Sequence, residues 1–133
     1  MTDTPPKIQL SGVAKSFGGK HVLRGVDFSI GKAESLVIIG GSGTGKSVTL
    51  KCILGILEPE RGTIKIDGED TTHVSSKKRD AHLSKFGMLF QGAALFDSLP
   101  VWRNVAFKLL QVEGMNRKEA KERAIATLAS VGL

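Results

Sequence analysis

One glycine-rich stretch of this sequence has residue types and spacing suited to chemistry: Gly40-Gly41-Ser42-Gly43-Thr44-Gly45-Lys46-Ser47. It matches the pattern G-x-x-x-x-G-K-[ST] at every fixed position. Glycines let the backbone fold into a concave loop whose N–H groups point inward at an anion. Lys46 supplies a mobile positive charge for the outer phosphates of a nucleotide, and the Ser47 hydroxyl suits Mg²⁺. The stretch therefore predicts a nucleotide-binding loop.

The residues on either side of this loop indicate how it is held. Leu36 to Ile39 is a continuous apolar run and predicts a strand covered on both faces. A helix is expected from about Lys46 to Leu57, with the positive end of its dipole aimed at the bound phosphate. No G-x-G-x-x-G occurs in the chain, which excludes the dinucleotide-binding fingerprint. The alternative is a glycine-rich turn that holds no ligand.

The rest of the chain alternates between strand and helix patterns. Apolar alternation predicts strands at 8–13, 22–30 and 63–67, separated by glycine turns at Gly18-Gly19 and Asp67-Gly68. In the second strand, a period of two places the following residues on one face: Val22, Arg24, Val26, Phe28 and Ile30. A further buried strand is expected at 86–90, a short helix within 69–85, and helices from Val101 onward. The layout is α/β.

Composition limits the classes of partner. The chain has 133 residues, one cysteine (Cys52) and a formal net charge of +6. Its densest basic run, Lys77-Lys78-Arg79, has no interleaved aromatic residue to stack on bases, so we expect no nucleic-acid partner. No apolar run approaches the ~20 residues of a membrane span. Any membrane role is therefore expected to come through a partner chain.

Three segments around the loop resemble the ATP-binding-cassette (ABC) transporter ATPases. They are VAKSFGGKHVLRGVDFSI (13–30), GILEPERGTIKIDGED (55–70) and FGMLFQGAALFDSLPVWRNVAF (86–107), and the similarity extends from about Ile8 to Leu133. The GGSGTGKSV and FQGAALFDSL stretches look most like the phospholipid-transport branch, the lipid-asymmetry or toluene-tolerance type. The resemblance implies ATP and Mg²⁺ as cofactors. It also implies a P-loop NTPase fold, in which a RecA-like core carries an antiparallel β subdomain near the N-terminus.

The resemblance also assigns roles to single residues. Phe17 occupies the position of an aromatic that stacks on adenine, and its alternative role is a core aromatic beside a turn. Gln91 occupies the position of a glutamine that reaches Mg²⁺ and the attacking water, while its alternative is an exposed loop amide. Val48 follows Ser47 where many relatives carry a hydroxyl near the α-phosphate, and binding is expected to survive this change. Arg103 stands where a glutamate is common.

The same resemblance predicts how the protein is organised and where it acts. Residues from Gln91 to Trp102 would face transmembrane permease subunits, with Phe96, Leu99 and Trp102 as candidate apolar contacts. The ATPase would work as a homodimer, cytoplasmic and peripheral on the inner membrane. Within the chain we expect an antiparallel β part at about 8–30 and 62–68, a P-loop core at about 35–57 and 86–91, and the start of a helical region at about 101–133.

Several parts that hydrolysis requires in this family are missing from the chain. No apolar strand ends in Asp-Glu, because Ile64 to Glu69 alternates with polar residues and leads into a turn. The LSGGQ signature is absent, since Leu10-Ser11-Gly12-Val13 precedes the loop, and no histidine lies far toward the C-terminus. The family pattern places these parts C-terminal to Leu133, so the chain is expected to be the N-terminal half of a longer ATPase. The alternatives are a non-catalytic nucleotide-binding module or a different P-loop NTPase or kinase.

Overall fold

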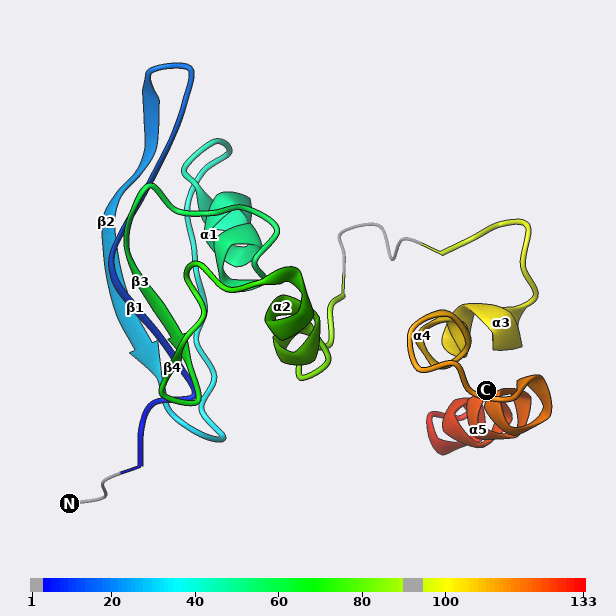
Figure 1. The fold of residues 1–133 in the computed structure, drawn as a ribbon. Coiled ribbons are helices and arrows are strands. Elements are labelled where there is room, and N and C mark those ends of the chain that lie inside the picture. The colour runs from blue at the N-terminus through cyan, green and yellow to red at the C-terminus, as the bar shows by residue number, and fades with distance from the viewer. Residues whose placement is uncertain (1–3, 90–94) are drawn as a thin grey trace. The chain divides into compact units, whose positions relative to one another are not determined.

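The computed structural model describes residues 4–89 and 95–133, which divide into two compact units (Figure 1). The first unit extends to Gly87 and holds a β-sheet with two helices, and the second begins at Met88 and is helical. Gln91 lies outside the described residues, as do the other residues of 90–94.

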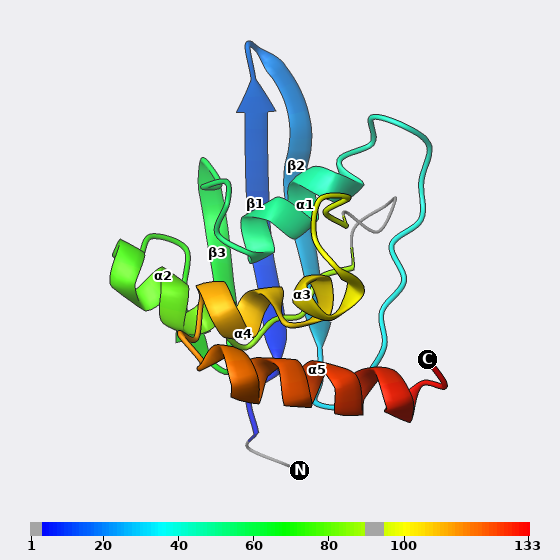
Figure 2. The same ribbon diagram turned by 90° about the vertical axis from the view of Figure 1, so that its right-hand side faces the viewer.

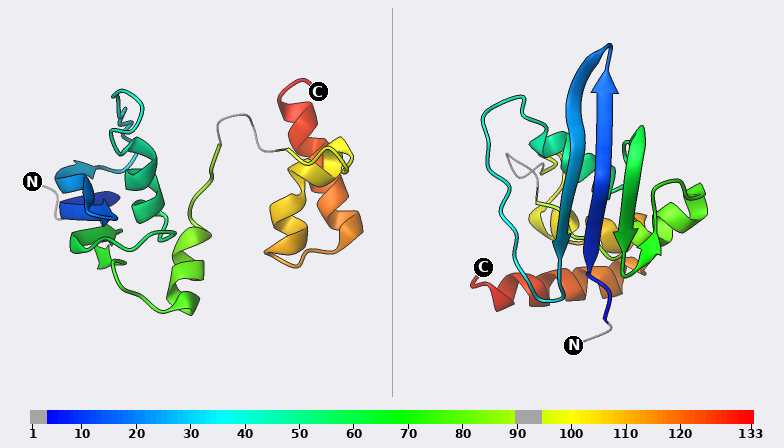
Figure 3. Two further views of the ribbon diagram at one scale, coloured as in Figure 1. Left: turned by 90° about the horizontal axis from the view of Figure 1, so that it is seen from above. Right: turned by 90° about the vertical axis from the view of Figure 1, so that its left-hand side faces the viewer.

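The sheet of the first unit is antiparallel, with the strand order β2-β1-β3-β4. Its strands are β1 (Ile8–Phe17), β2 (Lys20–Ile30), β3 (Arg61–Ile66) and β4 (Glu69–Asp70). Two helices, α1 (Lys46–Ile53) and α2 (Ser76–Leu83), lie on one face of it (Figures 1 and 3). The three strands, both turns and the short helix expected from the sequence are therefore confirmed, and the strands are longer than predicted.

An extra residue in β2 changes which side chains face the helices. Val13 pairs with Val26 whereas Ala14 pairs with Arg24, which leaves Gly25 as a bulge with φ of 100°. Because strand side chains alternate, one inserted residue reverses the faces beyond it. Leu23 is consequently buried and Arg24 is exposed. The prediction that one face runs without interruption from Val22 to Ile30 is therefore wrong, because Arg24 does not share the face of Val26.

Helix α1 ends earlier than its apolar pattern predicts. Gly55 has a left-handed backbone, with φ of 77°. The Gly55 amide donates to the Cys52 carbonyl (3.1 Å), and the Ile56 amide donates to the Lys51 carbonyl (2.9 Å). These two bonds satisfy the last carbonyls in a Schellman arrangement, which only a residue tolerant of positive φ closes without strain. The helix therefore stops at Ile53 and not at Leu57.

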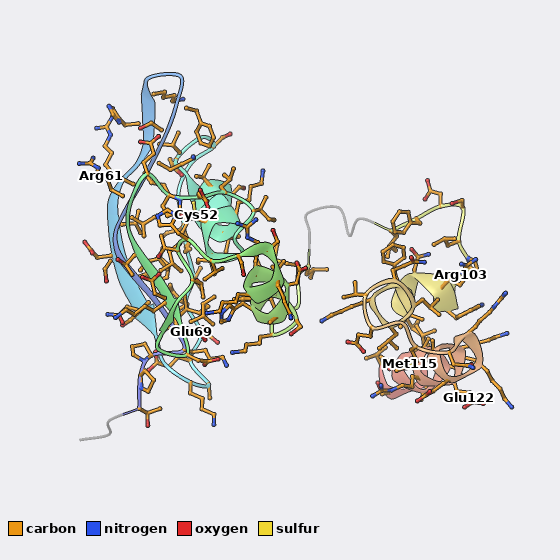
Figure 4. All side chains as sticks on the ribbon, in the orientation of Figure 1. Cys52, Arg61, Glu69, Arg103, Met115 and Glu122 are labelled. Carbon is orange, nitrogen blue, oxygen red and sulfur yellow. The ribbon has the colours of Figure 1, made fainter. Side chains whose placement is uncertain are left out.

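The core of the first unit joins β1, β2, β3 and α1. Its buried members are Leu10, Val13, Leu23, Cys52, Ile53 and Ile64, with Phe86 among the partly buried residues packed against them. Each fully buried aliphatic side chain contributes about 1.5–3 kcal/mol of transfer free energy. This packing attaches α1, and with it the glycine loop, to the sheet (Figure 4 labels Cys52 on α1).

Two predicted buried strands do not form. Residues 36–39 belong to no strand, and Val37 and Ile39 are 80% and 87% exposed. Residues 86–89 are also outside any strand, and Phe90 lies outside the described residues. An apolar run becomes a buried strand only when neighbouring strands pair with its backbone. The sheet of the described residues, β2-β1-β3-β4, includes neither run, so both predictions are wrong for this structure.

The second unit packs α5 (Arg117–Ser130) against α3 (Val101–Val105) and α4 (Phe107–Gln111), as Figure 2 shows. Ala106, Ala120 and Ala124 form its buried centre, and small side chains there let the helices approach closely. Asn116 caps α5 by accepting a hydrogen bond from the Lys118 amide at 2.8 Å. No helix in residues 4–89 and 95–133 has both the length and the apolar character needed to cross a membrane.

Asn104 organises the segment before α3, and the sequence patterns did not single it out. Its Oδ1 accepts from the Phe96 amide (2.8 Å), and its Nδ2 donates to the carbonyls of Phe96 (3.1 Å) and Leu99 (3.2 Å). These bonds hold Phe96 where its ring stacks on Phe107, with the ring centroids 4.8 Å apart. A lone Asn in an apolar helical pattern carries no sequence signal for such a role.

We expect Asn104→Ala to destabilise the second unit by about 2 kcal/mol, because it removes several side-chain-to-backbone hydrogen bonds at once. Denaturant unfolding followed by Trp102 fluorescence measures this loss, since that is the only tryptophan in the chain. Asn116→Ala is the control, because it removes one cap bond and should cost about 1 kcal/mol. Equal losses in the two variants would contradict the role assigned to Asn104.

Candidate nucleotide-binding site

The glycine loop, residues 40–47, lies between an extended segment and the first turn of α1. The loop and the turn between β1 and β2 are at the same end of the first unit (Figures 1 and 2). Both features therefore border the same region of this unit.

Gly45 connects the loop to the sheet and begins α1. It is the N-cap residue, with a left-handed backbone (φ 98°, ψ 10°), and it is buried. A Cβ at this position would come 2.8 Å from a methyl carbon of Leu23 and 3.2 Å from one of Val22. Only glycine satisfies both the backbone conformation and this close approach to β2. Its carbonyl accepts from the Thr49 amide (2.9 Å) and from the Thr49 hydroxyl (2.8 Å), which fixes the first turn of α1.

The start of α1 presents backbone donors toward the loop. The amides of Lys46, Ser47 and Val48 have no carbonyl four residues earlier within the helix, as at every helix N-terminus. These donors and the helix dipole favour an anion at this end. The Ser47 residue is exposed, whereas Val48 packs against the core, which explains why an apolar residue is accommodated there. The donor set therefore fits a phosphate group.

The Lys46 side chain folds back over the loop. Its Nζ donates to the carbonyl of Gly40 and to that of Gly41, the latter at 3.1 Å. The charged group is thereby held beside the same loop whose amides would face phosphate oxygens. An ammonium group gains more from a phosphate than from neutral carbonyls, because the phosphate carries a full negative charge that attracts the ammonium directly. A bound phosphate is expected to draw Lys46 away from these carbonyls.

Thr44 and Gly40 shape the entrance of the loop. The Thr44 hydroxyl donates to the Gly41 carbonyl at 2.7 Å. A Cβ on Gly40 would come 2.7 Å from that hydroxyl oxygen, so a side chain there would require the Thr44 hydroxyl to move. Gly43 has a positive φ of 78° and open space around it. Gly40, a fixed glycine of the motif, thus leaves room for the Thr44 side chain, whereas the variable Gly43 provides a left-handed backbone.

An apolar cleft of about 370 Å³ opens beside the loop within the first unit. It lies between β2 and the extended segment, and its lining includes Val26, Phe28, Ile38, Ile39 and Lys46. Residues 36–39, which fail to form a strand, thus contribute one of its walls. The cleft combines apolar walls with two cationic residues, Arg24 and Lys46, in its lining.

Phe17 ends β1 and precedes the glycine turn. Its side chain is 44% exposed, and the Lys15 Nζ lies 5.5 Å from the ring centroid. The structure therefore does not place Phe17 in the core, which was the alternative considered from the sequence. An exposed ring at the end of β1 presents a planar face for stacking, and its contact with adenine stays a prediction.

The residues expected to face a membrane subunit are only partly described. Gln91 lies outside the described residues. Leu99 is half-buried, and Phe96, at 48% exposure, presents apolar surface while it stacks on Phe107. Trp102 packs against the alanine cluster and carries Arg117 and Lys121 over its ring, at 5.6 and 5.4 Å from the centroid. Trp102 is therefore part of the packing of its own unit.

The cysteine and histidines form no metal centre in the part of the chain that the structure describes. Cys52 is buried on α1, and burial raises the pKa of its thiol, an effect that Lys15 opposes. The thiol is accordingly protonated near neutral pH and unreactive. Cys52 therefore has a structural role in the core of the first unit.

A loop of this geometry, capped by a left-handed glycine and followed by a helix with free amides, defines a P-loop nucleotide-binding fold. The family model described as ABC transporter matches residues 23–133. The chain therefore belongs to the ABC transporter ATPase family. Its fold is the ABC ATPase fold, represented here by part of the domain.

The relatives of this chain are longer than it is. It is 43% identical over 131 residues to protein TRIGALACTOSYLDIACYLGLYCEROL 3 of Arabidopsis thaliana, covering 98% of this chain and 38% of that protein. It is 41% identical to the probable ribonucleotide transport ATP-binding protein mkl of Mycobacterium tuberculosis, covering 95% and 35%. A solved dimeric ABC cassette, MJ0796 bound to ADP and Pi, has a TM-score of 0.78 and 28% identity, covering 92% and 56%.

Proposed function

We propose that this chain carries the ATP-binding site of an ABC transporter ATPase that couples nucleotide hydrolysis to phospholipid transport. The observation that carries the proposal is the start of α1, where Gly45, Lys46 and Ser47 place free amides, an ammonium group and a hydroxyl together. Mg²⁺ supplies charge neutralisation at the β- and γ-phosphates when it is bound. The amides of residues 46–48 and the Lys46 ammonium would hold the phosphates, and the Ser47 hydroxyl would face the metal.

Two further residues complete the proposed site. The exposed ring of Phe17 would stack on adenine, which needs no hydrogen bond and discriminates little between purines. Gln91 would reach the Mg²⁺ and attacking water, as the family resemblance implies. No apolar strand in the sequence ends in the Asp-Glu pair that the family resemblance implies for hydrolysis, because the carboxylates after β3, Asp67 and Glu69, flank a glycine turn. We therefore propose that residues 1–133 bind MgATP without hydrolysing it.

The proposed substrate is a phospholipid. The GGSGTGKSV and FQGAALFDSL stretches resemble the phospholipid-transport branch, and one relative bears the name of a galactolipid. The mycobacterial relative is named for ribonucleotide transport, which makes ribonucleotides the second candidate. The ATPase would act as a homodimer beneath permease subunits, through residues 91–102, and would be held peripherally on the membrane by them.

Calorimetry and phosphate release test the nucleotide part of this proposal. We expect residues 1–133 to bind MgATP and to release no phosphate in steady state, because the loop is present and the base is absent. A preference for MgGTP over MgATP of more than about 10-fold, or ~1.4 kcal/mol, would indicate a different class of P-loop protein. Steady-state phosphate release that Lys46→Ala removes would contradict the non-hydrolysing chain.

A transport assay tests the substrate. Vesicles containing the complete ATPase and its permease partner would receive a fluorescent phospholipid or a labelled ribonucleotide in parallel. We expect MgATP to drive movement of the phospholipid alone. Movement of the ribonucleotide alone would replace the lipid proposal and leave the ABC assignment unchanged.

A further inference from the structure

Helix α2 contacts the C-terminal end of α1 through one arginine. The Arg79 stem lies flat on Gly55, since a Cβ at Gly55 would come 3.2 Å from the Arg79 Cγ and Cδ and 3.3 Å from its Nε. The Arg79 Nη2 is 4.0 Å from a carboxylate oxygen of Glu58, which follows the end of α1. Arg79 therefore touches both the residue that ends the phosphate-binding helix and the segment beyond it.

Residues from three elements line a small pocket beside this contact. Its volume is about 10 Å³, and its lining from α1, β3, α2 and the adjoining segments includes Ile53, Gly55, Ile66, Arg79 and Leu83. A space of that size holds roughly one water molecule. The contact of the Arg79 stem with Gly55 can transmit displacement, because groups in direct contact have little room to adjust independently.

The C-terminal end of α2 is attached to the sheet and leads toward Gln91. The His82 Nε2 is 3.7 Å from a Glu69 carboxylate oxygen on β4, and the Lys85 Nζ is 3.1 Å from Asp67 (Figure 4 labels Glu69 beside α2). Lys7 and Lys85 together lower the pKa of Asp67 through their hydrogen bonds. The amides of Lys85 and Phe86 donate to the carbonyls of His82 and Leu83, at 3.1 and 3.0 Å. The chain then continues in sequence through Phe86 to Gln91.

We propose that Arg79 is a positioning residue that links nucleotide binding at the start of α1 to the segment that ends α2. The inference rests on the proposed nucleotide site. The proposal adds the contact between Arg79 and Gly55, through which the position of α2 depends on that of α1. The segment expected to respond to nucleotide is the C-terminal end of α2. No contact between Arg79 and the nucleotide is involved.

The physical argument concerns the two ends of one short helix. Helix α1 has eight residues, so its ends are about 12 Å apart at 1.5 Å per residue. A phosphate that draws Lys46 from the loop carbonyls changes the contacts at the first end. A short helix moves as a unit, and Gly55 at its end contacts the Arg79 side chain of α2. A shift of α1 would therefore displace Arg79. The end of α2 is held to β4 and Asp67, so the response is expected in its last hydrogen bonds.

Hydrogen exchange of the full 133-residue chain, with and without MgATP, tests the proposal. In the wild type we expect MgATP to slow exchange of the Ser84, Lys85 and Phe86 amides about threefold, because bound nucleotide raises the free energy of local opening there. In Arg79→Ala we expect the same affinity for MgATP by calorimetry and no slowing at these amides. Arg79→Lys keeps most of the aliphatic stem and should restore part of the effect.

Lys77→Ala is the matched control, because Lys77 lies exposed on the same helix and should leave the slowing unchanged. If Arg79→Ala simply loosens α2, exchange there becomes faster with and without nucleotide, but the ratio between the two states is kept, and the proposal fails. Unchanged slowing in Arg79→Ala also overturns it. If the wild type binds no MgATP, the proposed function fails first and the inference with it, and calorimetry distinguishes that case.

Discussion

Replacing Lys46 with alanine is expected to weaken MgATP binding to residues 1–133 by about 100-fold, or ~2.7 kcal/mol. The Lys46 ammonium is the charged donor that the structure places against the loop, bonded to the Gly40 and Gly41 carbonyls. Its removal leaves the backbone amides and the helix dipole as the remaining attraction for phosphate, and neither of these carries a full positive charge. Isothermal titration calorimetry at fixed ionic strength measures the change.

Lys51→Ala is the control for this experiment. Lys51 lies exposed in the last turn of the same helix, at the end away from the loop, and carries the same charge. We expect its removal to change the affinity by less than about twofold, because Lys51 is exposed and solvent and salt screen its charge. Circular dichroism of both variants confirms that α1 is retained. A Lys46→Ala variant that binds within threefold of wild type, a difference of about 0.65 kcal/mol, would remove Lys46 from the site.

Replacing Gly62 with alanine is expected to destabilise the first unit by more than about 3 kcal/mol, through backbone strain and overpacking together. Gly62 has φ of 91° at the start of β3. A Cβ there would overlap the backbone of Gly12 and come 2.6 Å from the Ser11 carbonyl oxygen. Neither neighbour is a side-chain end that can rotate away, so β1 and β3 must separate locally. Hydrogen exchange of the paired β1 and β3 amides reports the unfolding free energy of this unit.

Gly18→Ala separates strain from contact in the same sheet. Gly18 also has a positive φ, 53°, in the turn between β1 and β2, but nothing lies within 4 Å of its Cβ position. The cost there is the left-handed backbone alone, about 1–2 kcal/mol. Equal losses for the two variants would show that the approach of Gly62 to Gly12 is unimportant for stability.

Features that depend on neighbouring residues could be predicted from the sequence. The Gly18-Gly19 and Asp67-Gly68 turns form where expected, since each needs only a local left-handed backbone. Asn116 caps the start of α5 through a hydrogen bond to an amide two residues away, which is also a local interaction. The start of α1 at Lys46 also follows from the motif itself.

Features that depend on distant partners could not be predicted. The apolar run at 36–39 is typical of a buried strand. A buried strand must pair with neighbouring strands, and the local sequence does not show whether such strands are present. The bulge at Gly25 is visible only in the pairing of β2 with β1. Asn104 acquires its role from carbonyls of Phe96 and Leu99 that the chain brings back to it. In each case the partner is chosen by the tertiary fold.

The sequence by itself determined the family of this protein and the residue types of its glycine loop, from which phosphate binding is proposed. Residue types in the loop specify amides, an ammonium group and a hydroxyl, and these act through local backbone geometry. Only the tertiary structure decided that Gly45 must pack against β2, that Phe17 is exposed, and that Arg79 lies on Gly55. The physical reason is that a motif encodes the conformation of contiguous residues, whereas close contacts depend on where other elements of the chain are packed.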